Sequence, residues 1–216
     1  MKPIITPTFF INSLSVLKDR LELYEGIEGI TRIQLDPADE SFTANPTLSV
    51  ETMVKQPTTL KRDVHLMVEE PIDWLEICRQ EGVNMVIGHI ENMSSQEEFI
   101  KEARRLSLKV GLAVDLETDF NELEWLVAKE ADLILVMTVR AGQEQQKFSA
   151  AALERVKLLR KKGFIKEICV DGGVNEVTIK DCVRAGADVL AIGSALWKAA
   201  NVKQQLGKLM GLAYEI

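Results

Sequence analysis

The sequence has few cysteines and no long apolar run, and each absence excludes a class of protein. Cys78, Cys169 and Cys182 are odd in number and lack metal-type spacing, which favours reduced, partly buried thiols over a disulfide framework. No apolar segment approaches the length of a membrane span. The N-terminal MKPIITPTFF has one lysine and an apolar run too short for a signal peptide. We therefore expect a cytoplasmic protein without a membrane partner.

An excess of positive charge is also missing. Against 26 Lys+Arg stand 33 Asp+Glu, which gives a formal net charge of -7. This balance argues against nucleic acid or an anionic membrane as the main partner. It leaves room for a small anionic ligand, because local backbone N–H groups can hold an anion whatever the global charge.

What the sequence does contain is an alternation of strand-like and helix-like segments. Helical periodicity occurs in PIDWLEICRQEG, SSQEEFIKEARRLSL, FNELEWLVAKE and AALERVKLLRKKG. The strand-like runs are IITPTFF, ITRIQLD, DVHLMV, VNMVIGHI, LKVGLAVD, DLILVMTV, IKEICVDGG and DVLAIGS. Eight such repeats with no Pro/Ser-rich linker predict an α/β fold, a single (β/α)8 TIM-barrel domain over residues 1–216. A doubly wound open sheet is the alternative.

In a TIM barrel the chemistry collects where the strands end. Because side chains alternate along a strand, Gln34 should point into the lumen with Asp36, and His65 with Met67. The expected strand ends supply Thr8, Gln34, Asp36, His65, Met67, His89, Met137, Asp171, Gly172, Gly173, Gly193 and Ser194.

Two carboxylates among these side chains suggest acid/base chemistry. Asp36 and Asp171 come from different strand ends, so one could remove a proton and the other return one to the opposite face. His65 is either a satisfied core histidine or, beside these aspartates, a metal ligand or electrophile. Met67 and Met137 are either core filler or an apolar wall that keeps water from a reactive intermediate.

Two glycine motifs predict a phosphate site. VDGGVNE and AIGSALW stand at the seventh and eighth strand ends and contain Gly172–Gly173 and Gly193–Ser194. Glycines let the backbone approach phosphate oxygens, and N–H groups at the following helix start supply donors. The combination is more specific than either motif alone.

These motifs resemble the ribulose-phosphate 3-epimerase family over essentially the whole chain. DVHLMVEEP is similar to the family's third strand, VMTV to its sixth, and VDGGV followed by AGADVLAIGSA to its seventh and eighth. LDPADESFTAN resembles the second-strand segment and keeps Asp36, Asp39, Phe42 and Asn45.

The resemblance implies a sugar-phosphate 3-epimerase, an isomerase of pentose phosphate metabolism, with a possible homo-oligomer as the assembled form. Asp36 and Asp171 would be the acid/base pair that inverts carbon 3 of ribulose 5-phosphate or a similar ketose phosphate through an enediolate. The implied cofactor is a divalent cation (Zn, Fe, Mn or Co), weakly bound or absent, with Gln34, Asp36, His65 and Asp171 at the ligand positions. The implied substrate- and phosphate-binding residues are Thr8, His65, Met67, Met137, Gly142, Gly172, Gly173, Gly193 and Ser194.

The chain departs from the family pattern at several of these positions. Gln34 stands where the family has a histidine ligand, and its amide oxygen is a poorer ligand for zinc or iron than imidazole. Ala38 replaces a methionine beside the metal, and Thr8 replaces a serine. In the RAGQEQQKF segment, Glu144 and Gln145 fall on lost phosphate-binding glycines, so we expect a carboxylate at 144 to oppose phosphate unless it points away.

Two rival functions remain open at this point. Related barrels act as aldolase-like or decarboxylase-like enzymes on hexulose or gulonate phosphates. The second rival is a non-catalytic or repurposed barrel, which Gln34 and Glu144 favour. Retention of Asp36, His65 and Asp171 favours the epimerase.

Overall fold

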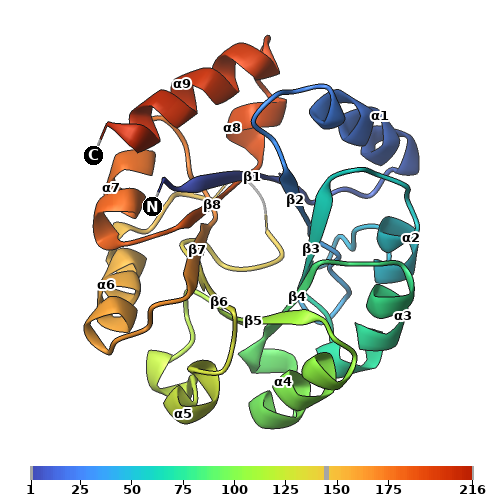
Figure 1. The fold of residues 1–216 in the computed structure, drawn as a ribbon, viewed down its shortest axis with the longest axis vertical. Coiled ribbons are helices and arrows are strands. Elements are labelled where there is room, and N and C mark those ends of the chain that lie inside the picture. The colour runs from blue at the N-terminus through green and yellow to red at the C-terminus, as the bar shows by residue number, and fades with distance from the viewer. Residues whose placement is uncertain (1, 144–145, 216) are drawn as a thin grey trace.

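A computed structural model describes residues 2–143 and 146–215, and within these residues eight parallel strands close into a barrel surrounded by helices (Figure 1). Each strand pairs with its sequence neighbours, and β8 closes the barrel by pairing with β1. This confirms the TIM barrel and excludes the open sheet. The strands are β1 (Ile4–Phe9), β2 (Arg32–Leu35), β3 (Lys61–Leu66), β4 (Met85–His89), β5 (Lys109–Val114), β6 (Leu133–Met137), β7 (Glu167–Asp171) and β8 (Val189–Ile192).

The helices lie outside the barrel and connect successive strands. The longest, α9, follows the eighth strand and packs on α7 and α8. None of the helices that the structure describes is both long and apolar enough to cross a membrane. The α-helices are α1 (Leu14–Glu25), α2 (Val50–Val54), α3 (Leu75–Gln80), α4 (Gln96–Arg105), α5 (Trp125–Ala128), α6 (Leu153–Lys161), α7 (Ile179–Ala185), α8 (Ser194–Trp197) and α9 (Val202–Tyr214), and the 3-10 helices are η1 (Pro71–Trp74), η2 (Ile90–Asn92), η3 (Phe120–Glu122) and η4 (Ala150–Ala152).

Local sequence signals explain several helix ends. The Ser95 hydroxyl accepts a hydrogen bond from the Glu98 backbone N–H and caps α4. Gly186 ends α7 with a φ of 111°, a conformation that glycine adopts without strain. The predicted helix in FNELEWLVAKE is less regular than expected, since it divides into η3 and the four-residue α5.

Side-chain alternation along the strands produces two apolar layers. On β6, Leu133, Leu135 and Met137 belong to a cluster inside the barrel, whereas Ile134 and Val136 pack outward against the helices. The inner cluster fills the lumen, so the barrel is a packed core with a functional end rather than a pore. The three cysteines are free and buried, which agrees with their reduced interpretation.

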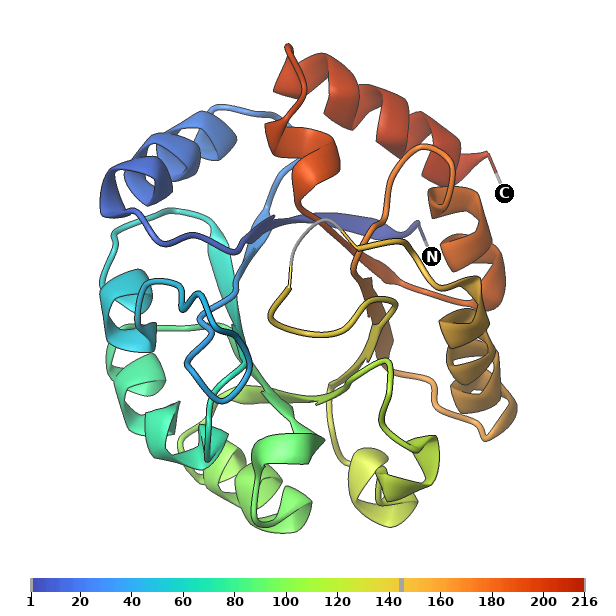
Figure 2. The same ribbon diagram turned by 180° about the vertical axis from the view of Figure 1, so that it is seen from behind.

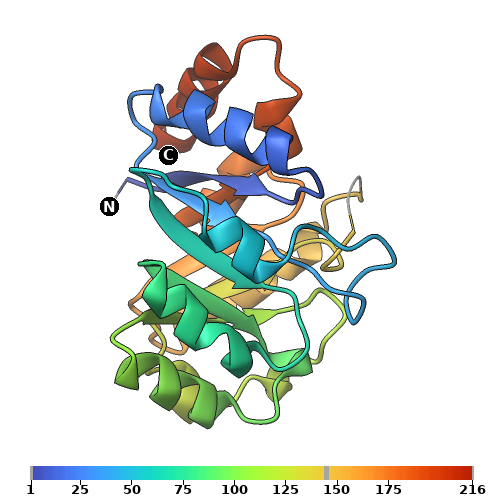
Figure 3. The same cartoon turned by 90° about the vertical axis from the view of Figure 1, so that its right-hand side faces the viewer.

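The loops that follow β2 and β6 project from the carboxyl-terminal end of the barrel (Figure 3). Seen from that end, the described part of the segment after β6 lies across the barrel mouth (Figure 2). The two loops meet at Gly142, where an added Cβ would lie 2.6 Å from the Phe42 carbonyl oxygen. The φ of Gly142 is +74°, so this contact requires a residue without a side chain.

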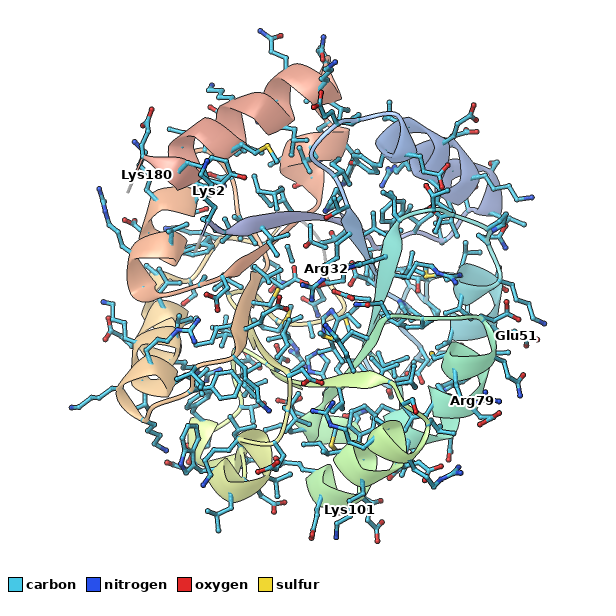
Figure 4. All side chains as sticks on the ribbon, in the orientation of Figure 1. Lys2, Arg32, Glu51, Arg79, Lys101 and Lys180 are labelled. Carbon is cyan, nitrogen blue, oxygen red and sulfur yellow. The ribbon has the colours of Figure 1, made fainter. Side chains whose placement is uncertain are left out.

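A buried ion-pair network closes the opposite end of the lumen. Arg32 bonds to the buried Asp63 and donates to Glu167 at 2.8 Å. Asn84 donates to the second Asp63 oxygen at 3.1 Å. Burial raises the pKa of Asp63 and outweighs the lowering effect of Arg32. Arg32 lies near the barrel centre in Figure 4, two residues along the strand from Gln34.

Candidate active site

A pocket opens at the carboxyl ends of the strands, and it brings together side chains from distant parts of the sequence. Gln34 contacts the carboxylates of this pocket from its buried side. The other predicted site residues all line the pocket, namely Thr8, Asp36, His65, Met67, Met137, Gly142, Asp171, Gly172, Gly173, Gly193 and Ser194.

The two aspartates converge on the Gln34 amide. Its Nε2 donates to Asp36 Oδ1 at 2.8 Å and to Asp171 Oδ2 at 2.6 Å. The same nitrogen lies 3.4 Å from His65 Nδ1. These contacts explain why Gln34 and Asp36 are buried on the same face: the Gln34 amide joins Asp36 to Asp171 on β7.

The close approach of the two carboxylates changes the protonation of Asp171. Burial and the like charge of Asp36 raise the pKa of Asp171 from its ordinary value of 3.8 to about 6, against the lowering effect of His65 and Gln34. Burial alone would lower the pKa of His65, but hydrogen bonding to Asp36 and the charges of both aspartates raise it. A carboxyl group that titrates near neutrality is well suited to take up and return protons.

The raised pKa predicts a pH-dependent stability cost at Asp171. The folded protein binds this proton more tightly than the unfolded chain, so stability is lost as pH rises from about 4 through about 6. We expect Asp171→Asn to raise the free energy of unfolding at pH 8 by about 1–3 kcal/mol over the wild type, as measured by urea denaturation in a chelating buffer. The difference should vanish at pH 4. An equal difference at both values would contradict the assigned shift.

Two further side chains, His89 and Glu91, form a hydrogen-bonded series with His65 on the side of its ring away from the aspartates. His65 Nε2 lies 2.8 Å from His89 Nε2, and His89 Nδ1 lies 2.8 Å from Glu91 Oε2. Burial opposes the ionisation of Glu91, yet the hydrogen bond from His89 lowers the pKa of Glu91 to about 2. Burial lowers the pKa of His89. A neutral His89 therefore donates from Nδ1 to Glu91 and accepts from His65 Nε2–H, so that His65 Nδ1 faces the aspartates.

The hydrogen bonds among His65, His89 and Glu91 predict which ring nitrogen of His89 carries the proton. The sequence has two histidines, His65 and His89, so ¹⁵N spectra of labelled protein resolve each ring. We expect His89 to carry its proton on Nδ1 in the wild type. Glu91→Gln should weaken this preference and lower kcat by roughly 10–100-fold, as loss of outer orienting partners does elsewhere. Glu97→Gln on the exposed face of α4 is the matched control. An unchanged His89 tautomer in Glu91→Gln would contradict the proposed hydrogen bond from His89 to Glu91.

The other end of the pocket is suited to an anion. Gly172 has a φ of +103°, and an added Cβ would lie 2.5 Å from Val139 Cγ2, so the backbone after β7 packs directly under the β6 loop. Two cations, Arg140 and Lys198, also line the pocket. The Lys198 ammonium lies 5.0 Å from the Trp197 ring centre.

Three of the described residues could offer ligand atoms to a metal ion. One atom each from Asp36, His65 and Asp171 lies within 4.8 Å of the others. A bound ion would have to sit about 2.0–2.2 Å from each donor. The Gln34 amide nitrogen already lies 2.6–3.4 Å from these atoms. As the side chains stand, the donor set is suitable for a cation, but the Gln34 amide nitrogen lies beside the three donors at the distance of a fourth ligand and turns N–H groups toward two of them.

Comparison with known proteins assigns this site to a family. The model described as the ribulose-phosphate 3 epimerase family matches residues 5–197. The chain belongs to the ribulose-phosphate 3-epimerase family. Ribulose-phosphate 3-epimerase of Treponema pallidum (strain Nichols) is 33% identical over 199 residues, which cover 89% of this chain and 90% of that protein. The enzyme of the same name from Aquifex aeolicus (strain VF5) is 31% identical over 190 residues and 85% of each chain.

Solved structures share the barrel at low identity. The 3-keto-L-gulonate-6-phosphate decarboxylase from Vibrio cholerae aligns with a TM-score of 0.71 at 13% identity, over 100% of this chain and 99% of that one. A 3-hexulose-6-phosphate synthase aligns with a TM-score of 0.69 at 16% identity, over 98% and 99% of the two chains. At these identities the likeness shows the fold alone.

Several pocket features of this ribulose-phosphate 3-epimerase family member were not predicted from sequence. The HIE stretch placed a histidine at a strand end with an acid two residues on, and this period-two spacing could have indicated the His89–Glu91 pair. Lys198 carried no comparable signal. Ala38, in the loop that follows β2, forms an isolated parallel β-bridge with Met67. Glu144, whose carboxylate was expected to oppose phosphate, and Gln145, which falls on a lost glycine, lie outside the described residues.

Proposed function

We propose that this chain is a ribulose 5-phosphate 3-epimerase, or acts on a similar ketose phosphate, and uses Asp36 and Asp171 as its acid/base pair. Membership of the family makes it an epimerase acting on sugar phosphates. The observation that carries the proposal is the placement of both carboxylates at one pocket, within hydrogen-bonding distance of a single amide nitrogen.

The reaction needs one proton removed and one returned at the same carbon. One aspartate takes the proton from carbon 3, and the C–H electron pair passes into an enediolate whose charge rests on the carbon 2 oxygen. The other aspartate gives a proton to the opposite face of carbon 3, which restores the ketone with inverted configuration. Because its pKa is raised to about 6, Asp171 can both hold and release a proton near neutral pH.

The pocket residues supply binding and exclusion of water. Gly172–Gly173 and Gly193–Ser194 would hold the phosphate through backbone donors, as loops after the last two strands do in this fold. Thr8, Met67 and Met137 line the same pocket and would help to exclude water from it. Asp36, His65 and Asp171 would hold a divalent cation if Gln34 withdrew its amide nitrogen, and bound metal would stabilise the enediolate charge.

The direct test is incubation with ribulose 5-phosphate, with xylulose 5-phosphate measured by a coupled assay or NMR. We expect conversion toward an equilibrium mixture of the two. Formaldehyde release from a hexulose phosphate, or carbon dioxide release from a gulonate phosphate, without epimerisation would favour the aldolase or decarboxylase interpretation. Absence of turnover with ketose phosphates would leave the non-catalytic barrel.

Arg140 and Lys198 are expected to act on phosphate affinity rather than on chemistry. Each side chain lines the pocket, and each is exposed, so solvent weakens its attraction for an anion. Arg140→Gln and Lys198→Gln should each raise KM about 5-fold with little change in kcat. Lys101→Gln on the barrel periphery (Figure 4) is the matched control. A fall in kcat at unchanged KM would contradict this assignment.

A further inference from the structure

The position of the Gln34 amide nitrogen is unusual for a side chain next to a candidate metal site. It lies 2.8 Å from Asp36 Oδ1, 2.6 Å from Asp171 Oδ2 and 3.4 Å from His65 Nδ1. The same three residues form the candidate ligand group. The amide therefore stands at a fourth ligand position, where it bonds two of the donors that a shared cation would contact.

Chemistry identifies the Gln34 amide atom that faces the aspartates as nitrogen. A primary amide has two N–H donors on one nitrogen, and ionised carboxylates only accept. An amide oxygen in the same place would face two acceptor oxygens with no hydrogen between them. Gln34 is 1% exposed and held in β2 between Thr8 and Asp63, so the amide cannot turn to solvent without leaving the lumen.

We propose that Gln34 replaces the divalent cation in this chain: its amide bridges Asp36 and Asp171, and epimerisation proceeds without a bound metal ion. The inference rests on the proposed function and assigns the enzyme to a metal-independent class of proton transfer. Admission of a cation would require Gln34 to rotate, break both carboxylate bonds and present a neutral oxygen. Imidazole would be the better ligand at this position.

The bridge gives Gln34 the role of a positioning residue. Its N–H groups separate two like charges and fix one oxygen of each carboxylate, so the second oxygen of each is oriented by the same contact. When one aspartate takes up the carbon 3 proton, it no longer needs the amide N–H as a partner. That donor then becomes available to the developing oxyanion, in the way that amide donors stabilise such charge elsewhere.

The experiment compares metal content and chelator resistance in the wild type, Gln34→His and Gln34→Glu. Gln34→Glu keeps the shape but removes both N–H donors and adds a third carboxylate. We expect dialysed wild type to carry no stoichiometric metal by mass spectrometry and to keep its activity in EDTA. Both variants should bind Co²⁺ about 100-fold more tightly than the wild type and lose roughly 100-fold in activity when chelated.

Gln204→His, on the exposed part of α9, controls for weak metal capture by an added surface histidine. One tightly held ion per wild-type chain, or EDTA-sensitive wild-type activity restored by Zn²⁺, Mn²⁺ or Co²⁺, would overturn the inference. Failure of the proposed function would be distinct: no turnover in EDTA or with any of these metals. Even then the Co²⁺ titration decides the inference, since equal affinity of wild type and Gln34→His would contradict it.

Discussion

Asp36→Asn and Asp171→Asn are each expected to lower net epimerisation by roughly 10³–10⁴-fold while the barrel stays folded. Asparagine keeps the shape of aspartate but cannot take up a proton at neutral pH, so one face of carbon 3 loses its catalyst. The measurement is kcat/KM for conversion of ribulose 5-phosphate, made beside a urea unfolding curve for each variant.

The two aspartate variants also distinguish two bases from one. The surviving carboxylate can still remove and return a proton on its own face, so one variant should exchange the carbon 3 hydrogen with solvent without inverting it. Asp181→Asn, a carboxylate on the outer helix α7, is the control and should leave kcat unchanged. Near-normal epimerisation by either site variant would remove that aspartate from the mechanism.

Arg32→Met is expected to give the largest loss of stability, about 3–5 kcal/mol in the free energy of unfolding. The change leaves Asp63, 2% exposed, without its guanidinium partner at the closed end of the lumen. In the variant, the Asp63 carboxylate either stays charged in an apolar site or must take up a proton when the protein folds. The cost should therefore be larger at pH 8 than at pH 5, as measured by urea denaturation.

A second substitution separates charge from packing in this network. Asp63→Asn added to Arg32→Met removes the unpaired charge and keeps a polar group beside Asn84. We expect the double variant to recover most of the lost stability. Equal instability of the single and double variants would show that Arg32 acts through packing of its stem and through the contact of its guanidinium with the Met85 sulfur.

The sequence predicted the fold well because its signals were local and repeated. On β6, alternation places Leu135 inside the barrel and Val136 against the helices, and the other strands show the same alternation. The helix around Trp125 was overpredicted, since 3.6-residue spacing persisted where the backbone forms short 3-10 and α-helical turns. Periodicity reports which face is buried and does not fix the length of a helix.

The site was predicted as a set of residues but not as a set of contacts. Period-two alternation placed Gln34 beside Asp36 in the lumen, and strand ends placed Asp171 at the same mouth. The Gln34 amide nitrogen reaches both carboxylates only because the barrel closes with a particular stagger of its strands, which no local sequence pattern encodes. The His89–Glu91 pair was missed for the same reason, because its meaning lies in the contact with His65.

Solvent deuterium incorporation tests the central claim, which is that two carboxylates at one pocket invert carbon 3. Wild-type protein is incubated with ribulose 5-phosphate in deuterium oxide, and the product is analysed by NMR. The account predicts xylulose 5-phosphate that carries deuterium at carbon 3 and none at carbon 1. Deuterium at carbon 1, or inversion with complete retention of the original hydrogen, would contradict it.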